Sequence, residues 1–278
     1  MRSPAPIVFL VDNGSLRPSA TFGLRRLAAC LWERTGLRVE AVSLLHSHKI
    51  EPERLDGVPA TIVRRRFREL IEAGERSFVI LPLFLGPSLA LADYLPQLVL
   101  EAQETQPDVV VTIADPLTGT DVAAPDIRLA EMLADHVRAM LRARNWQGAK
   151  VALVDHGTPA RPVNQVRNAV AEQLQALLEV DSCVVKACSM ERREGDEYAF
   201  NEPLLERAGQ LAGFAGGDLI VAMFFLLAGR HAGEGGDVAE ICQGLMGSGG
   251  FREVCTTPLL AEHPRLLEVL EDRLRAVL

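Results

Sequence analysis

The chain of 278 residues is long enough for two domains of ordinary size, each with its own hydrophobic core. Its composition, 48% hydrophobic and 24% charged, is that of an average soluble globular protein. The net charge of −8 argues against the broad basic surface that general nucleic-acid binding requires, but it leaves room for a local basic pocket that holds an anionic small molecule.

Short apolar runs rich in Val, Ile and Phe alternate with longer stretches of helical period along the whole chain. Continuous apolar strands between helices predict parallel sheets that are covered on both faces. In the first half we expect strands near 7–11, 38–45, 77–85 and 108–114, and helices near 20–36, 56–75, 93–105 and 122–145. In the second half we expect strands near 150–155, 182–189, 218–227 and 252–255, and helices near 162–179, 201–215, 236–246 and 262–277.

The predicted fold class is therefore α/β, with two similar doubly wound, parallel four-stranded domains that face a central cleft. The stretch 145–149 ends one helical pattern and precedes a second copy of the opening strand, so we expect domains at 1–147 and 148–278. Residues 1–6 lead into only five apolar residues before Asp12, which is too short for a secretory signal, and no later run approaches a membrane span. We expect a cytoplasmic protein with no membrane partner.

The chain carries nearly the same strand-to-loop segments twice, but histidines occur only in the second copy. The matching segments are 7–15 with 150–158, and 84–90 with 225–231. At the two strand ends the first copy has Asn13 and a stretch without histidine, whereas the second has His156 and His231. Because ligands of such sheets bind at the carboxyl ends of the strands, we expect the two histidines to face one another.

A carboxylate completes this candidate site. Glu191 follows the second strand of the same half and is expected to point toward the same crevice. Two imidazoles and a carboxylate suit Fe²⁺, Co²⁺, Ni²⁺ or Zn²⁺, and so few protein ligands leave positions open for reaction. A lone histidine or a charged strand end also has a purely structural interpretation, and the glycine-rich loop after His231, with Asp237 placed to cap the next helix, lacks the GxGxxG spacing of a dinucleotide site.

The order strand–His–Gly, strand–Met–Glu and strand–Gly–x–His resembles the class II tetrapyrrole chelatases. It is most similar to the sirohydrochlorin chelatases that insert cobalt or iron in the cobalamin and siroheme pathways. The resemblance covers the whole chain as a tandem of two family-type halves. Residues 258–264 also resemble the family's last strand-to-helix segment, and 115–119 form its first copy.

The resemblance implies ATP-independent insertion of a divalent metal substrate, Co²⁺ or Fe²⁺ with Ni²⁺ a further choice, into sirohydrochlorin or a related anionic tetrapyrrole. His156 and His231 would bind the metal, and Glu191 would assist ligation or proton removal. No nucleotide is expected, and the protein would be a monomer or a homodimer. The substrate carboxylates call for basic residues, for which we single out Arg161, Arg230 and Arg17. We take Arg17 and Arg161 as matching positions after the first turn of each copy.

The first copy departs from the family pattern, since Asn13 replaces the histidine, 88–90 (Ser-Leu-Ala) replaces Gly-x-His, and Leu45 or a neighbour stands near the expected carboxylate. That copy is then either a structural lid or a half reshaped to hold the macrocycle. The departures also leave open a non-catalytic paralogue that binds a metal or tetrapyrrole, and more weakly a two-lobed solute binder.

The remaining histidine pair, the arginine cluster and the cysteines are best interpreted as structural features. His46 and His48 form an HxH pair that lacks further ligands and is more typical of an exposed loop. Arg68 and 64–66 form a basic cluster typical of a solvated helix face. The five cysteines contain no CxxC pair and are expected to be mostly buried thiols.

Overall fold

The computed structural model describes residues 5–247 and 250–278, so the first four residues of the opening segment lie outside the described part. The strands are β1 (Ile7–Asp12), β2 (Val39–Ser43), β3 (Ser77–Pro82), β4 (Val110–Ile113), β5 (Lys150–Asp155), β6 (Val184–Ser189), β7 (Asp218–Met223) and β8 (Glu253–Thr256). The α-helices are α1 (Pro18–Thr35), α2 (Val63–Glu72), α3 (Leu95–Thr105), α4 (Ile127–Arg144), α5 (Arg161–Leu178), α6 (Asp237–Gly247) and α7 (Arg265–Arg275). None of these helices is both long and apolar enough to cross a bilayer.

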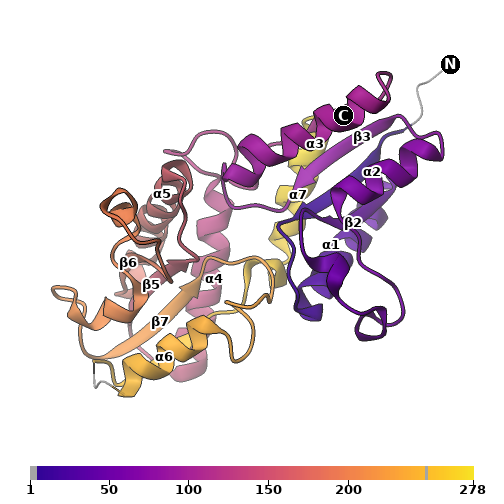
Figure 1. Ribbon diagram of the computed structural model, residues 1–278. Helices are drawn as coiled ribbons and strands as arrows, with labels where there is room; N and C mark the ends of the chain where they lie inside the picture. Colours follow the sequence, from indigo (N-terminus) through magenta and orange to yellow (C-terminus); the bar gives the residue numbers. More distant parts are fainter. Residues whose placement is uncertain (1–4, 248–249) are drawn as a thin grey trace. The chain divides into compact units, whose positions relative to one another are not determined.

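The predicted α/β class is confirmed: the strands form two parallel four-stranded sheets, each flanked by helices (Figure 1). The predicted helix over 201–215 is wrong, because this stretch forms 3₁₀ turns, of which η6 (Leu205–Gln210) is the longer part. Pro203 supplies no N–H to a helix, and Gly209 and Gly213 stabilise a helix poorly. The helix expected over 56–75 begins only at Val63 for the same kind of reason, since Gly57 has φ +78°.

The strand order is β2-β1-β3-β4 in one sheet and β6-β5-β7-β8 in the other. In each sheet the second strand along the chain lies on one side of the first strand, and the third and fourth strands lie on its other side. The boundary between β1 and β3, and likewise between β5 and β7, is therefore the switch point at which ligands of open α/β sheets bind. The registers repeat as well, with Asp12 opposite Ser43 and Asp155 opposite Ser189.

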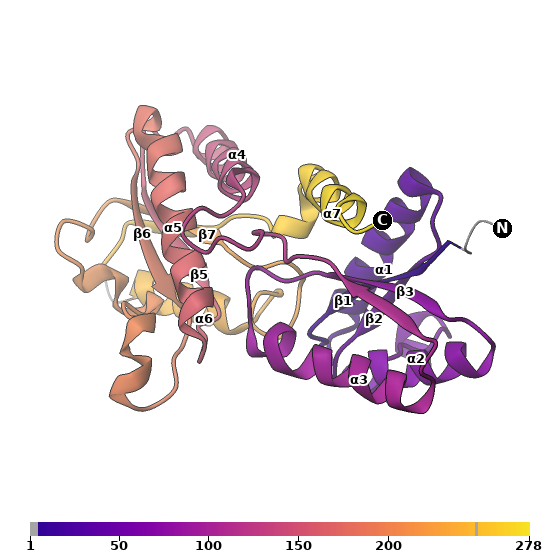
Figure 2. The ribbon, with the colours of Figure 1, turned by 90° about the horizontal axis from the view of Figure 1, so that it is seen from above.

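The first compact unit consists of 1–120, 227–229 and 266–278. Helices α2 and α3 cover one face of its sheet, and α1 and α7 cover the other (Figure 2). The core under α2 contains the rings of Phe9, Phe67 and Phe78, whose centroids lie 5.1 to 5.6 Å apart. Helix α7 is joined to α1 by an ion pair between Arg34 and Glu271.

The second unit consists of 121–226 and 230–265. Helix α4 packs beside α5, and Arg138 of α4 donates to Asp181 (2.9 Å) and to the carbonyl of Leu177 (2.7 Å). Packing thus crosses the sequence boundary: α4 precedes residue 148 but belongs to the second unit, and most of α7 belongs to the first. The division at 147/148 into two sequence repeats stays a prediction.

Candidate metal site

The two histidines of the second unit come together at its switch point. His156 follows β5, and His231 lies in the loop that leaves β7. Their Nε2 atoms are 3.2 Å apart, and Glu191, which follows β6, places Oε1 3.4 Å from Nε2 of His156. The expected convergence of these three side chains is therefore present in the structure.

Hydrogen bonds on the far side of each ring assign the tautomers. Nδ1 of His231 lies 2.5 Å from Oδ2 of Asp237, and Nδ1 of His156 lies 3.0 Å from the carbonyl oxygen of Gly157. Both oxygens can only accept, so each Nδ1 carries the proton. In the neutral form of each ring the lone pair then lies on Nε2, and the two Nε2 atoms face one another.

Two imidazole Nε2 atoms at this separation suit a cation between or beside them. Two nitrogens about 2.0–2.1 Å from one tetrahedral ion lie roughly 3.3–3.4 Å apart, close to the 3.2 Å observed. Across residues 5–247 and 250–278, however, no three His, Cys, Asp or Glu side chains already form a metal cage. The pair therefore offers two fixed ligands, with Glu191 as a solvent-exposed carboxylate in reach.

A glycine makes the turn after His156 possible. Gly157 has φ +90°, and a Cβ there would lie 1.9 Å from the carbonyl oxygen of Glu191. The same device stands in the first unit, where Gly14 has φ +90° and a Cβ would lie 1.8 Å from the carbonyl oxygen of Leu45. Only glycine allows the two strand-end loops to approach this closely.

A buried polar network lies beneath His156, and the sequence analysis missed it. Oδ1 of Asp155 accepts from the hydroxyl of Ser189 (2.6 Å) and from the backbone N–H of Gly157 (3.2 Å). Arg167 of α5 donates to the same hydroxyl (2.6 Å). Burial raises the pKa of the Asp155 carboxyl, and the charge of Arg167 opposes that shift. The recurrence of aspartate at the end of β1 and β5 was the available signal.

A protein-family model matches the first copy of the repeat. Residues 7–138 match the model of the CbiX family. No curated protein matches the chain at the sequence level.

Solved structures extend the likeness of fold to the whole chain. SirB from Bacillus subtilis with Fe³⁺ has a TM-score of 0.67 at 14% identity, covering 98% of this chain and 95% of that one. The sirohydrochlorin chelatase SirB from B. subtilis subspecies spizizenii in complex with cobalt gives 0.68 at 13%, covering 98% and 94%. DR2241 from Deinococcus radiodurans, a multi-domain protein with structural similarity to chelatases, gives 0.60 at 17%, covering 97% of this chain and 54% of its own. At these identities the likeness concerns the fold.

The copy that matches the CbiX model lacks the two histidines and the carboxylate that converge in the other copy. The backbone N–H of Leu45 bonds to the carbonyl of Asn13, as that of Glu191 bonds to the carbonyl of His156. These contacts make Asn13 the counterpart of His156, and Leu45 that of Glu191. The loop after β3 repeats the loop after β7 in the same way, which makes Ala90 the counterpart of His231.

The three selected arginines have different surroundings. Arg161 begins α5, and its guanidinium lies 4.7 Å from the ring centre of Phe200. Arg230 is 75% exposed and lies 3.8 Å from Asp237. Arg17 is exposed in the first unit, just before α1. The expected match between Arg17 and Arg161 is wrong by one position, because Arg17 and Ala160 occupy the same place before their helices.

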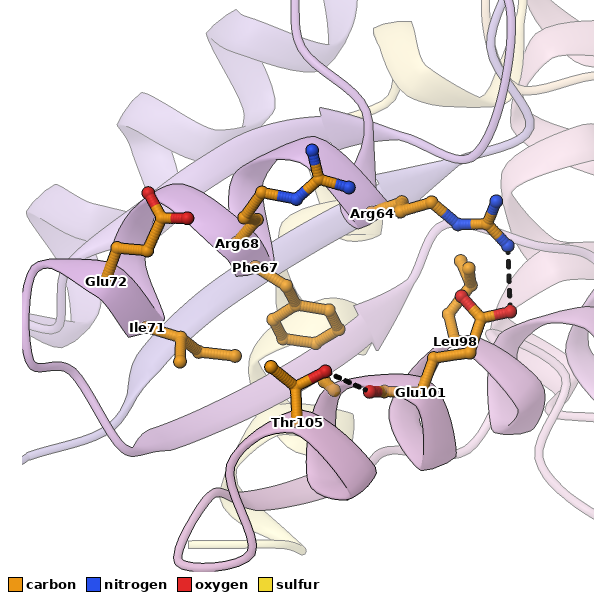
Figure 3. Close-up of a pocket in the computed structure, with 9 residues that line it drawn as sticks. Arg64, Phe67, Arg68, Ile71, Glu72, Leu98, Glu101 and Thr105 are labelled. Carbon is orange, nitrogen blue, oxygen red and sulfur yellow. Dashed lines mark hydrogen bonds and ion pairs between the residues drawn. The ribbon is translucent and has the colours of Figure 1, made fainter.

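Two arginines of the basic cluster in the first unit form ion pairs with neighbouring carboxylates. Arg64 lies 2.9 Å from Glu101, and Arg66 bonds to Glu40 and Glu69. A cavity of 290 Å³ between α2 and α3 is lined by Arg64, Phe67, Arg68 and Leu98 among others (Figure 3). It lies in the first unit and contains no histidine.

Two further expectations concern histidines and thiols outside the site. Residues 47–49, which include His48, form a 3₁₀ turn after β2, and no metal cage forms around it within the described part of the chain. Four of the five cysteines are buried, as expected: Cys183, Cys188, Cys242 and Cys255.

Proposed function

We propose that this protein inserts a divalent metal, Co²⁺ or Fe²⁺, into sirohydrochlorin or a related anionic tetrapyrrole, without a nucleotide. The observation that carries the proposal is the pair of Nε2 atoms of His156 and His231, 3.2 Å apart at a sheet switch point. The CbiX match of the first copy and the chelatase-like fold of the whole chain support the same reaction class.

The donor set fits a metal that must be handed on. Imidazole nitrogen binds first-row divalent ions but holds them less firmly than a thiolate cage would. Two protein ligands leave most coordination positions for water, and then for the nitrogens of the macrocycle. His156 and His231 would hold the ion at the strand ends of the second unit until the ring nitrogens replace them.

Metal insertion also releases protons. The macrocycle binds M²⁺ through four nitrogens and gives up two N–H protons, so charge and atoms balance as M²⁺ in and two H⁺ out. Glu191 is exposed and 3.4 Å from Nε2 of His156, and its carboxylate can accept a proton there. His156, once it releases the metal, can accept the second.

The carboxylates of the substrate require cations near the histidines. Arg161 lies over Phe200, and Arg193 has its guanidinium 5.8 Å from the ring centre of Tyr198. Both aromatic residues belong to η5 (Asp196–Asn201), the segment shortly after Glu191. We assign Arg161 and Arg193 to substrate carboxylates, and the exposed Arg230 to the same role.

The test is an insertion assay with sirohydrochlorin and Co²⁺, Fe²⁺ or Ni²⁺, followed by visible absorption. We expect turnover by the native chain and its loss in the double variant His156→Ala/His231→Ala. The matched control is Asn13→Ala, which alters the equivalent position of the first copy and should leave turnover intact. Unchanged turnover in the double variant would refute the assignment. Binding of the macrocycle without turnover for any of the three ions would favour a non-catalytic binding protein.

A further inference from the structure

We propose that Arg167 is a positioning residue that fixes the orientation of the His156 ring, and this inference rests on the proposed function. Arg167 is 1% exposed on α5, a charged side chain buried against the strand ends of the second unit. It contacts neither histidine. Burying a guanidinium is costly unless all its donors are used, so its partners indicate its role.

The guanidinium of Arg167 joins three separate segments. Its Nη1 donates to the hydroxyl of Ser189 (2.6 Å) at the end of β6 and to the carbonyl of Asn201 (3.1 Å) in η5. The same nitrogen lies 3.8 Å from Oδ1 of Asp155 at the end of β5. Its Nε and Nη2 atoms both donate to Oδ1 of Asn168, at 3.1 and 2.9 Å, and these two bonds fix the plane of the guanidinium group.

Two of these partners hold the backbone on both sides of His156. Asp155 precedes the histidine and accepts from the N–H of Gly157, which follows it (3.2 Å). The side chain of Asn201 accepts from the N–H of Thr158 (3.0 Å) and donates to its carbonyl (2.9 Å). The stretch 156–158 is thus clamped at three backbone groups, and Arg167 connects both clamps. The hydrogen bond from Nδ1 of His156 to the Gly157 carbonyl depends on this clamped conformation.

The first copy shows what the same strand ends look like without the arginine. Leu24 of α1 occupies the place of Arg167, at the same distance along the chain from the repeated strand. Asp12 and Ser43 repeat the aspartate–serine pair, but Oδ1 of Asp12 has no hydrogen-bond partner among the described residues. The copy without the arginine is also the copy with asparagine in place of the histidine. Arg167 and the proposed metal ligand His156 therefore occur together in the second copy, and neither has a counterpart of its own kind in the first copy.

The experiment uses the full chain and Co²⁺ as the probe. Co²⁺ affinity and the visible d–d bands report the ligand geometry, and the imidazole ¹⁵N shifts of His156 report its tautomer in the absence of metal. Removal of an outer partner of a metal-bound histidine weakens metal binding about 10–100-fold in characterised sites. We expect a loss in that range for Arg167→Met, altered d–d bands, and a mixture of His156 tautomers. We expect Co²⁺ affinity to recover partially in Arg167→Lys, because lysine keeps the positive charge but lacks the planar set of guanidinium donors.

Ser189→Ala is the second variant, in case loss of the buried arginine prevents folding. It removes one hydroxyl that bridges Arg167 and Asp155, and should weaken Co²⁺ binding in the same direction. Ser43→Ala removes the equivalent hydroxyl of the first copy and should change neither affinity nor spectrum.

Folded Arg167→Met and Ser189→Ala proteins with native Co²⁺ affinity, native bands and a single His156 tautomer would overturn the inference. If the native chain binds no Co²⁺, the proposed function fails, and the metal-free tautomer still decides the role of Arg167.

Discussion

Replacement of Gly157 by alanine separates an effect on the proposed metal site from an effect on the fold, because Gly14 provides a matched control. Each glycine has φ +90°, and a Cβ at either would come within 2 Å of a carbonyl oxygen, that of Glu191 at 1.9 Å or that of Leu45 at 1.8 Å. Alanine in left-handed backbone costs roughly 1–2 kcal/mol. Moving the carbonyl away by about 1.5 Å, to an ordinary contact of 3.4 Å, adds an overpacking cost of about 1–3 kcal/mol.

Both variants should therefore lose about 2–5 kcal/mol of stability. At about 2–4 °C per kcal/mol, each should melt roughly 4–20 °C below the native chain. Their effects on metal binding should differ. Gly157→Ala displaces the backbone of both His156 and Glu191, and a misplacement of about 1 Å at a site can cost on the order of 100-fold. Gly14→Ala displaces only Asn13 and Leu45.

Thermal unfolding followed by circular dichroism, together with Co²⁺ titration below the melting range, measures both effects. We expect similar losses of stability and a loss of Co²⁺ affinity in Gly157→Ala alone. Equal loss of affinity in the two variants, or native affinity in Gly157→Ala, would refute the reasoning.

Three further predictions follow from other contacts. Asp237→Asn removes the carboxylate that orients His231, so Co²⁺ affinity measured by calorimetry should fall about 10–100-fold, whereas native affinity would show that this contact is dispensable. Arg161→Ala should raise KM for sirohydrochlorin about 5–10-fold with little change in kcat, as expected for loss of one charged contact. The control is Arg142→Ala, on the exposed surface of α4, and an equal rise in KM there would show that the net charge of the protein causes the effect. Burial raises the pKa of Asp12 from 3.8 to about 6, so the folded state holds its proton more tightly and stability should fall by about 3 kcal/mol as pH rises from about 4 to 6. Asp12→Asn should flatten that part of the stability–pH curve, and an unchanged curve measured by denaturant unfolding would contradict the assignment.

The order of strands and helices could be predicted from the sequence because buried parallel strands are continuous apolar runs. The convergence of His156 and His231 could be predicted too, since both follow strands and the repeat places those strands side by side. The helix expected over 201–215 does not form, because Pro203 and Gly209 interrupt the helical period of its apolar residues. The sequence could not predict that α4 packs in the second unit and most of α7 in the first. Periodicity identifies the apolar face of a helix but not the sheet that this face covers.

The residues that hold the two histidines in place were harder to predict than the histidines themselves. Arg167 stands in a helical pattern like any surface arginine, and only tertiary packing shows it to be buried. Asp237 was expected as a helix cap, a common role for aspartate before a helix, yet its carboxylate contacts His231. The two arginines after the first turns were misaligned by one residue because the repeated helices begin with different residues, Pro18 and Arg161.

The central claim, that His156 and His231 share one cation, is tested most directly by anomalous diffraction at the cobalt edge from crystals of the full chain grown with Co²⁺. We predict one strong peak about 2.1 Å from Nε2 of both rings, with Glu191 or water completing the coordination. A peak in the first copy beside Asn13, or a Co²⁺-soaked crystal with the two rings turned apart and no peak between them, would contradict it.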